Sequence, residues 1–343
     1  MSEKKRTEIQ ELGEFGLIDH LTEGFQPKNK STLKGVGDDA AVVAAGRDDA
    51  LVITTDSLLE GIDFDLTYFP LKHLGYKAVT VGVSDVLAKN ALPEQIMLSL
   101  GVSAKLPVEA LKDLYEGVEF ACKELGVDMV GGDTTASMTG LVINITTIGR
   151  AKRKALAYRS GAQFNDLICI TGNLGAAYMG LHLLEREKRV LRDVQNPEPQ
   201  FAGYEYLLQS YLKPRARKDI VEALAAEGIV PTSMIDISDG LASEVLQICK
   251  ASKCGARIYL DRIPIAKQTT ALAEEMHTDP VVAALNGGND YELMFTVPVA
   301  MQEIVMSLGL VDIVGHITRE STGAYLVTPD GCDIKLRAQG FKE

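Results

Sequence analysis

A set of aspartates stands where apolar runs end, at glycine turns or on an apolar helix face. These residues are Asp39, Asp56, Asp85, Asp133, Asp236 and Asp239. Hydroxyl side chains stand beside them, at Thr54, Thr55 and Ser238. Oxygen ligands without a histidine or cysteine partner suit magnesium and not zinc or copper. Because magnesium binds proteins through carboxylates together with substrate phosphates, the set indicates metal-assisted phosphoryl transfer or nucleotide hydrolysis.

Each aspartate also has a structural explanation, because aspartate is common in turns and helix caps. This explanation is weaker for the whole set than for any one member. Asp85 illustrates the choice. Its spacing from Leu74, Ala78 and Val81 puts it on the apolar stripe of a helix expected over 73–91. A bare charge is costly there, so Asp85 is either a metal ligand or a buried capping or ion-paired carboxylate.

The segment 35–40, Gly-Val-Gly-Asp-Asp-Ala, comes close to a dinucleotide-binding pattern. That pattern should follow an apolar strand and open a helix. Here it follows a polar loop and leads into 41–43, which we expect to be a strand. Its two aspartates would also face a pyrophosphate with the wrong charge. Asp38 and Asp39 repel each other unless something positive lies between them.

Composition limits the possible partners. The chain has 343 residues, enough for two domains, and a formal net charge of −12. This charge argues against nucleic acid or an anionic membrane as the main partner, and it requires metal ions if the substrate is anionic. The N-terminus lacks the apolar segment of a signal peptide, and no apolar run approaches a membrane span. The cysteines lack metal-type spacing, so we expect reduced thiols in a cytoplasmic protein.

Alternating strands and helices predict an α/β domain over 1–150. A buried strand at 51–53 leads into Thr54, Thr55 and Asp56, which would stand at its carboxyl end, where α/β folds bind ligands. A second short strand at 128–130 would stop at the glycines before Asp133.

A basic stretch over 150–159 marks the boundary to a second α/β domain, 151–343. It ends at Arg159 and is either a site for nucleotide phosphates or a solvated linker. The segment 190–200 predicts an exposed loop. Phe341 looks like an exposed aromatic residue without a core role.

Several motifs together resemble thiamine-monophosphate kinase, in order along nearly the whole chain. They lie at 35–41 (Gly-Val-Gly-Asp-Asp-Ala-Ala), 54–61 (Thr-Thr-Asp-Ser-Leu-Leu-Glu-Gly), 75–78 (Gly-Tyr-Lys-Ala), 84–85 (Ser-Asp), 131–135 (Gly-Gly-Asp-Thr-Thr), 159–162 (Arg-Ser-Gly-Ala), 235–240 (Ile-Asp-Ile-Ser-Asp-Gly) and 290–293 (Asp-Tyr-Glu-Leu). Each motif alone is weak, and the combination is specific. The resemblance implies the aminoimidazole ribonucleotide synthetase-like fold, an α/β (α+β) arrangement of two domains. Its N-terminal domain dimerises through a shared β-barrel, and nucleotide binds at the domain junction.

The resemblance also implies the reaction and its residues. The γ-phosphate of ATP passes directly to thiamine phosphate, giving thiamine diphosphate and ADP, with several Mg²⁺ ions between the phosphate chains and no protein nucleophile. The positions that match metal ligands are Asp39, Thr54, Thr55, Asp56, Asp85, Asp133, Asp236 and Asp239. The positions that match ATP contacts are Gly132, Asp133, Arg159 and Ser238. Metals held by carboxylates would screen the phosphates and fix in-line geometry.

Two positions depart from the family pattern, and both are associated there with thiamine phosphate. The family commonly has His where this chain has Asp63, and Glu where it has Asn289. Asp63 would favour binding near the cationic thiazolium and oppose it near the phosphate, whereas Asn289 removes a charge and keeps an amide acceptor. Phe341 stands where the family places a C-terminal aromatic against the substrate. We therefore expect Asp63, Asn289 and Phe341 to set substrate affinity more than chemistry.

Two alternatives remain. One is another ATP-dependent enzyme of the same superfamily. A selenophosphate synthetase should carry a reactive cysteine in a glycine-rich N-terminal segment, but the first cysteine here is Cys122. The hydrogenase-maturation relative should end in a reactive cysteine, whereas the last four residues of this sequence are Gly340, Phe341, Lys342 and Glu343. The other is a protein that binds nucleotide or thiamine phosphate without turnover, because of the changes at Asp63 and Asn289.

Overall fold

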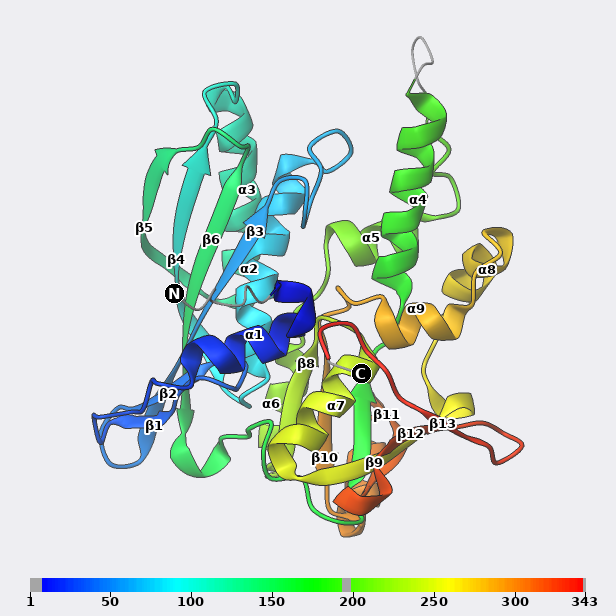
Figure 1. Cartoon of the computed structure of the whole chain (residues 1–343). Coiled ribbons are helices and arrows are strands. Elements are labelled where there is room, and N and C mark those ends of the chain that lie inside the picture. The colour runs from blue at the N-terminus through cyan, green and yellow to red at the C-terminus, as the bar shows by residue number, and fades with distance from the viewer. Residues whose placement is uncertain (1–7, 193–198, 342–343) are drawn as a thin grey trace, which may run out of the picture.

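The computed structural model describes residues 8–192 and 199–341 as two β-sheets with helices packed around them (Figure 1). In this part of the chain, the mixed α/β arrangement of two domains agrees with the fold class predicted from the sequence. The loop predicted at 190–200 falls largely on 193–198, which lie outside the described residues. The domain boundary at 150 stays a prediction, with one sheet ending at Lys152 and the next beginning at Leu167.

The first sheet of the described residues has the strand order β1-β2-β3-β6-β4-β5, in which β4 and β5 are parallel and the other pairs antiparallel. Its strands are β1 (Thr32–Lys34), β2 (Ala41–Ala44), β3 (Asp49–Leu59), β4 (Leu92–Val102), β5 (Asp128–Ala136) and β6 (Val142–Lys152). β3 pairs with β6 along its whole length, from Asp49 opposite Lys152 to Leu59 opposite Val142.

The strand ends predicted before Thr54 and Gly131 were wrong. β3 continues through Thr54, Thr55 and Asp56 to Leu59, and β5 continues through Asp133 to Ala136. Polar side chains do not end these strands, because the backbone ladder to the neighbouring strand continues irrespective of side-chain polarity. The hydroxyl and carboxylate groups therefore lie within the sheet, on one face or the other, and not at the carboxyl end of a parallel strand.

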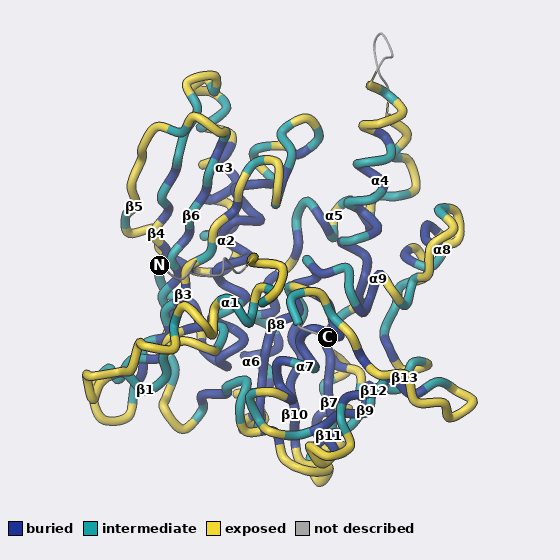
Figure 2. The backbone as a smooth tube through the Cα atoms, in the orientation of Figure 1, coloured by how far each residue is buried: buried dark blue, intermediate teal, exposed yellow. Residues whose placement is uncertain are grey.

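One face of this sheet is covered by α2 (Leu71–Leu87) and α3 (Val108–Leu125) (Figure 1). Residues from Leu74 to Leu87 are buried except Asp85, so the apolar surface of α2 extends around the helix and is wider than the single stripe predicted (Figure 2). The two helices approach closely at Gly75 and Gly117. A Cβ added at Gly75 would lie 2.0 Å from a backbone oxygen of α3, so only glycine fits there.

The second sheet of the described residues has the order β13-β12-β9-β11-β7-β10-β8, with β9 and β12 parallel and the other pairs antiparallel. Its strands are β7 (Leu167–Thr171), β8 (Ser233–Ile237), β9 (Cys254–Tyr259), β10 (Glu292–Val297), β11 (Val311–Arg319), β12 (Ala324–Val327) and β13 (Asp333–Lys335).

Further helices surround both sheets. The α-helices are α1 (Gly13–Thr22), α4 (Ala176–Leu191), α5 (Glu205–Leu212), α6 (Lys218–Ala226), α7 (Leu241–Ser252), α8 (Lys267–Glu275), α9 (Pro280–Asn286) and α10 (Gln302–Ser307). The short 3-10 helices are η1 (Ile9–Glu11), η2 (Arg153–Ala155), η3 (Leu260–Arg262), η4 (Val299–Met301) and η5 (Glu320–Thr322). Within residues 8–192 and 199–341, no helix is both long and apolar enough to cross a membrane.

The helix α2 joins the two halves. It packs against β3, β4 and β6 of the first sheet and against β8 of the second. One apolar core cluster accordingly contains Leu74 and Val83 of α2 together with Met234 of β8 and Phe295 of β10. A side chain at the C-terminal end of α2 can therefore meet side chains from β3 and β8, and this is where Asp85 lies.

Candidate active site

Three predicted carboxylates come from different elements and meet at the junction of the two sheets. Asp56 is on the face of β3 that α2 covers, Asp85 is on α2, and Asp236 is on β8. The Thr54 hydroxyl donates to Asp85 and lies 3.3 Å from the Asp39 carbonyl oxygen. The Ser84 hydroxyl donates to Asp236 Oδ2 over 2.6 Å. We call Asp56, Asp85 and Asp236 the junction carboxylates.

The junction carboxylates carry negative charge that no cation of the described chain offsets well. Burial, followed by the neighbouring charge of Asp39, raises the pKa of Asp56 to about 6 and that of Asp236 to about 7. Burial, followed by the charges of Asp236 and Asp56, also raises the pKa of Asp85. Asp56 Oδ2 is buried and has no hydrogen-bond partner in the described residues. Such a site favours a cation that would offset the mutual repulsion.

Asp38 and Asp39 lie in a different electrostatic setting, because two cations of the chain itself neutralise them. Lys89, at the end of α2, contacts Asp38 and pairs with Asp39 Oδ2 at 2.6 Å. Arg159 donates from Nε to Asp39 Oδ1 over 2.7 Å, and its backbone N–H lies 3.3 Å from Asp38 Oδ2. The side chains of Lys89, Asp38 and Asp39 are fully buried. We call these four residues the neutralised cluster.

The pKa shifts confirm this pairing. Burial alone would raise the pKa of Asp39, but Lys89 and Arg159 lower it below its usual range. Burial alone would lower the pKa of Lys89, but Asp39 and Asp38 raise it. The positive group expected between Asp38 and Asp39 is thus a lysine, whereas the sequence had suggested a metal ion. The only sequence signal for Lys89 was a charged residue at the end of an otherwise apolar helix.

Thr55 and Asp133 lie on the opposite face of the first sheet from the junction carboxylates. Side chains alternate along β3, so Thr54 and Asp56 face α2 while Thr55 is exposed on the other side. Thr55 Oγ1 hydrogen-bonds Asn144 on that face over 3.3 Å. Asp133 is exposed on the edge strand β5, about three strand spacings or ~14 Å across the sheet from β3. One copy of the described chain does not bring Asp133 to the junction carboxylates.

Gly132 and the residues after β8 complete the predicted nucleotide contacts. A Cβ at Gly132 would lie 1.8 Å from the Leu98 carbonyl oxygen, so the pairing of β5 with β4 requires glycine there. Ser238 is half-buried and Asp239 is exposed just beyond β8. The Asp239 N–H donates to the buried Glu244 side chain over 3.0 Å, a residue that the sequence did not single out.

The predicted substrate residues are held by partners that the sequence did not reveal. Asn289 Oδ1 accepts a hydrogen bond from the buried Lys77 over 2.8 Å. The Asp63 side chain accepts from the Leu59 N–H over 2.8 Å. Phe341 was expected to have no core role, but its ring packs on Phe15 of α1 with ring centroids 4.8 Å apart. The contact was unpredictable because it joins the two ends of the described chain.

The residues present fit magnesium only together with other oxygen donors. In the described part of the chain, no three His, Cys, Asp or Glu side chains are arranged to hold a metal ion by themselves. Asp56 nevertheless has a buried oxygen without a hydrogen-bond partner in the described residues, and its charge helps to raise the pKa values of Asp85 and Asp236. Magnesium normally keeps waters and binds through one or two carboxylates plus substrate phosphates. The junction carboxylates therefore fit a magnesium–phosphate complex better than a free ion.

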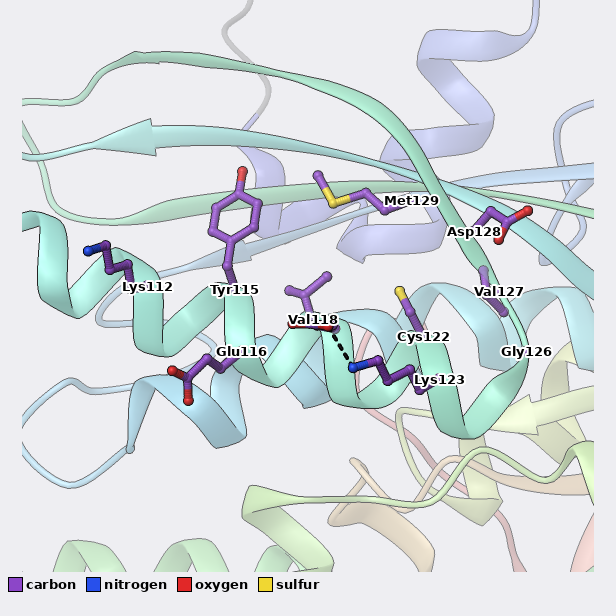
Figure 3. A pocket seen from close by; sticks show the side chains of 11 residues that line it. Lys112, Tyr115, Glu116, Val118, Cys122, Lys123, Gly126, Val127, Asp128 and Met129 are labelled. Carbon is purple, nitrogen blue, oxygen red and sulfur yellow. Dashed lines mark ion pairs between the residues drawn. The ribbon is translucent and has the colours of Figure 1, made fainter.

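A separate hollow of about 650 Å³ lies between α3 and the start of β5 (Figure 3). Its lining combines Tyr115, Val118 and Cys122 with Met129 from the strand. Lys123 and Glu119, which form an exposed ion pair, also line it. It contains none of the predicted site residues, and its paired charges do not suit a phosphate.

Comparison with known proteins finds related sequences over most of the chain. Residues 37–151 match the AIR synthase related protein, N-terminal domain, and residues 165–327 match the C-terminal domain. A thiamine-monophosphate kinase from Buchnera aphidicola (subspecies Schizaphis graminum) is 35% identical over 92% of this chain and 94% of its own.

Solved structures agree with that similarity. The structure of AaThiL complexed with AMPPCP and TMP is 30% identical, covers 99% of both chains and superposes with a TM-score of 0.81. Hydrogenase maturation protein HypE in complex with ATP is 20% identical, with a TM-score of 0.68 over 92% of this chain and 91% of its own. This second likeness shows a shared fold alone.

Proposed function

The chain belongs to the thiamine-monophosphate kinase family, and we propose on this premise that it transfers the γ-phosphate of ATP to thiamine phosphate, giving thiamine diphosphate and ADP. The observation that carries the proposal is the meeting of Asp56, Asp85 and Asp236 at the domain junction with their charge unneutralised. Two anionic phosphate chains can meet there only if cations accompany them. The site is therefore suited to a nucleotide that arrives with its metal.

The junction carboxylates would hold Mg²⁺ together with phosphate oxygens and water. Bound magnesium would neutralise the charge that develops on the transferred phosphoryl group. Thr54 and Ser84 orient Asp85 and Asp236 by hydrogen bonds, which keeps both carboxylates facing the junction. Thr55, Asp133 and Asp239 remain predicted metal ligands, and Asp39 can serve only if Lys89 or Arg159 gives up part of its contact.

Arg159 supports the proposed binding of the ATP phosphates. Its side chain pairs with Asp39 but remains 21% exposed, so the guanidinium retains donors for a phosphate oxygen. The neutralised cluster would hold this side chain in place, because Asp39 fixes one edge of the guanidinium. Gly132 and Ser238 remain predicted nucleotide contacts.

We propose that the active form is a homodimer joined through the uncovered face of the first sheet. This face exposes Leu59 and Met97, which are 41% and 37% accessible, beside the polar side chains of Thr55 and Asn144. The edge strand β5 also has free backbone groups along one side, which is typical of a strand that pairs with another chain. A dimer could bring Asp133 of one copy near β3 of the other, which one copy alone does not do.

A cytoplasmic location fits this proposal. The reaction needs ATP, and the five cysteines of the sequence are all free in the structure. Thiamine phosphate and ATP are the proposed partners, and neither nucleic acid nor membrane is required for the reaction.

Phosphorus NMR tests the activity directly. The protein is incubated with ATP, magnesium and thiamine phosphate, and ADP and thiamine diphosphate are followed over time. A reaction without protein and one with unphosphorylated thiamine serve as controls. We expect diphosphate only in the complete reaction. Its absence, with thiamine phosphate bound in a parallel calorimetric titration, would instead support binding without turnover.

A further inference from the structure

Lys77 is buried in the middle of α2, and no carboxylate of the described residues forms an ion pair with it. It is 1% exposed, and its ammonium lies 4.1 Å from the centre of the Tyr211 ring and 5.6 Å from that of Phe69. Among the described residues, its ammonium donates one side-chain hydrogen bond, to Asn289 Oδ1 over 2.8 Å. Burial lowers the pKa of Lys77 to about 7, while the charge of Asp63 acts in the opposite direction. A group held at such cost calls for a role beyond packing.

The contact with Lys77 determines which way the Asn289 amide faces. Lys77 donates to the amide oxygen, and its protonated form, which has no lone pair, requires this orientation of the amide. The Tyr291 hydroxyl also donates to this oxygen over 3.4 Å. Asn289 is half-buried, and among the described residues its Nδ2 donates no hydrogen bond. The end of the amide that makes no hydrogen bond in the described chain is therefore the donor Nδ2, whereas the sequence suggested an acceptor.

The backbone around Asn289 is fixed next to the junction carboxylates. Its N–H donates to the Ser238 carbonyl over 2.7 Å, and the Tyr291 N–H donates to the Ile237 carbonyl over 2.8 Å. Asn289 has a positive φ of 62°. Burial raises the pKa of the Tyr291 phenol, and the charges of Asp236, Asp56 and Asp63 raise it further. The Tyr291 hydroxyl thus contacts the Asn289 amide and is within electrostatic reach of the carboxylates proposed to hold the phosphates.

We propose that Lys77 is a positioning residue that turns the Asn289 amide outward, so that Asn289 Nδ2 donates a hydrogen bond to thiamine phosphate. This inference rests on the proposed function, and it specifies whether one substrate subsite donates or accepts a hydrogen bond. The subsite takes a hydrogen-bond acceptor, either an oxygen of the phosphate monoester or a ring nitrogen of the pyrimidine. An aspartate in place of Asn289 would offer only acceptors and would reverse this polarity.

A purely structural role for Lys77 makes different predictions. If Lys77 served only to fill the core, Lys77→Met would fill the same space and would leave the KM of both substrates unchanged or shift both together. If Lys77 positions Asn289, Lys77→Met should weaken the binding of thiamine phosphate alone. In either case the Tm should stay level or rise, because a buried ammonium is removed. The matched control is Lys72→Met, which changes a lysine on the same helix whose side chain is 60% exposed.

Steady-state kinetics and calorimetric titration with thiamine phosphate test the proposal in the full chain. We expect Lys77→Met and Asn289→Ala each to raise the KM and Kd of thiamine phosphate about tenfold, the effect of one lost hydrogen bond to a charged group. The KM of ATP should change less than about twofold, and Lys72→Met should match the unaltered protein. The KM and Kd of thiamine phosphate for the double variant should equal those of Asn289→Ala alone, because Lys77 acts through Asn289.

The source of the acceptor is distinguished by titrating Asn289→Asp with both thiamine phosphate and thiamine. Weaker binding of thiamine phosphate alone indicates a phosphate oxygen, and weaker binding of both indicates the pyrimidine. The inference would be overturned if Lys77→Met bound thiamine phosphate as tightly as the unaltered protein. It would also be overturned if the increases in Kd from the two single variants multiplied in the double variant. Neither result would contradict the formation of thiamine diphosphate. No diphosphate from the unaltered protein would instead remove the proposed function, and the binding measurements would still decide the subsite.

Discussion

The neutralised cluster and the junction carboxylates are built from the same residue type, close together, yet they behave oppositely. Asp39 is fully buried and meets Lys89 and Arg159, which lower its pKa. Asp56 and Asp236 are also largely removed from water, and burial, followed by the charge of Asp39, raises their pKa values.

The difference shows where the cation comes from in each region. The chain supplies its own cations at Asp38 and Asp39, so this region is complete when the protein folds. No lysine or arginine of the described chain forms an ion pair with the junction carboxylates, so under the proposed function their cation would come from solution. Burial of an acid alone would not separate a structural role from a ligand-binding role; the identity of the neighbouring charges does.

Removing Lys89 should have the largest effect on stability. Lys89→Met leaves the Asp38 and Asp39 carboxylates buried with only Arg159 and Lys34 nearby, so we expect a loss of about 3–5 kcal/mol in the free energy of unfolding. Urea unfolding at pH 7 measures this loss. Lys34→Met is the control, because Lys34 is 3.4 Å from the same Asp38 but partly exposed, and should cost less than about 1 kcal/mol. Equal losses in the free energy of unfolding for Lys89→Met and Lys34→Met would show that Lys89 is no more important than Lys34 for neutralising the buried carboxylates.

Removing a junction carboxylate should affect turnover and not stability. Asp56→Asn should lower kcat by about 100-fold or more, because the proposed metal complex loses a ligand. The same variant should have an equal or higher Tm without magnesium, since it relieves repulsion with Asp39. Thermal unfolding with and without magnesium and ATP tests both statements. Retention of the magnesium-dependent rise in Tm by Asp56→Asn would contradict the assignment.

The two regions should also differ in their pH dependence. Raised folded-state pKa values mean that Asp56 and Asp236 favour folding at pH below about 4 and lose that contribution as pH rises through about 6 and 7. Without metal, the protein should therefore lose on the order of 2 kcal/mol between pH 5 and 8. Magnesium with ATP should restore most of it. The free energy of unfolding of Asp236→Asn should depend less on pH than that of the unaltered protein. An unchanged slope would show that the junction carboxylates do not titrate as described.

Asp133 should show the smallest effect on stability, within about 0.5 kcal/mol for Asp133→Asn, because the side chain is exposed. Its role in a dimer can be tested by mixing inactive Asp56→Asn and Asp133→Asn proteins under conditions of subunit exchange. If the partner supplies Asp133, one of the two sites in each mixed dimer is intact and activity returns. If the mixture stays inactive although mass measurements show mixed dimers, Asp133 does not act across the interface.

Much of the candidate site could be read from residue types in their local context. The carboxylates at Asp56, Asp85 and Asp236, with no histidine or cysteine near them in sequence, already indicated oxygen-only metal chemistry. The order of the motifs also predicted the family and the two-domain fold, which the comparisons confirm. These properties depend on short segments, and short segments retain their chemistry wherever the fold places them.

The faces of the first sheet were not predictable in the same way. Thr54 and Thr55 are neighbours in sequence, but the period of two along β3 sends one toward α2 and the other to the uncovered face. The sequence suggested that the strand ended before them, so this separation could not be seen. Only the pairing with β6 shows that the strand continues.

The sequence by itself determined which groups could bind a metal and a phosphate, because acidity and ligand preference belong to the side chain. The tertiary structure decided which of those groups are paired with a cation of the chain itself and which are left for the proposed metal. Lys89 reaches Asp38 and Asp39 from about fifty positions away, and Lys77 turns Asn289 from more than two hundred. Charge interactions act through space and weaken with distance, so partners brought together only by folding set the final role of each acid and amide.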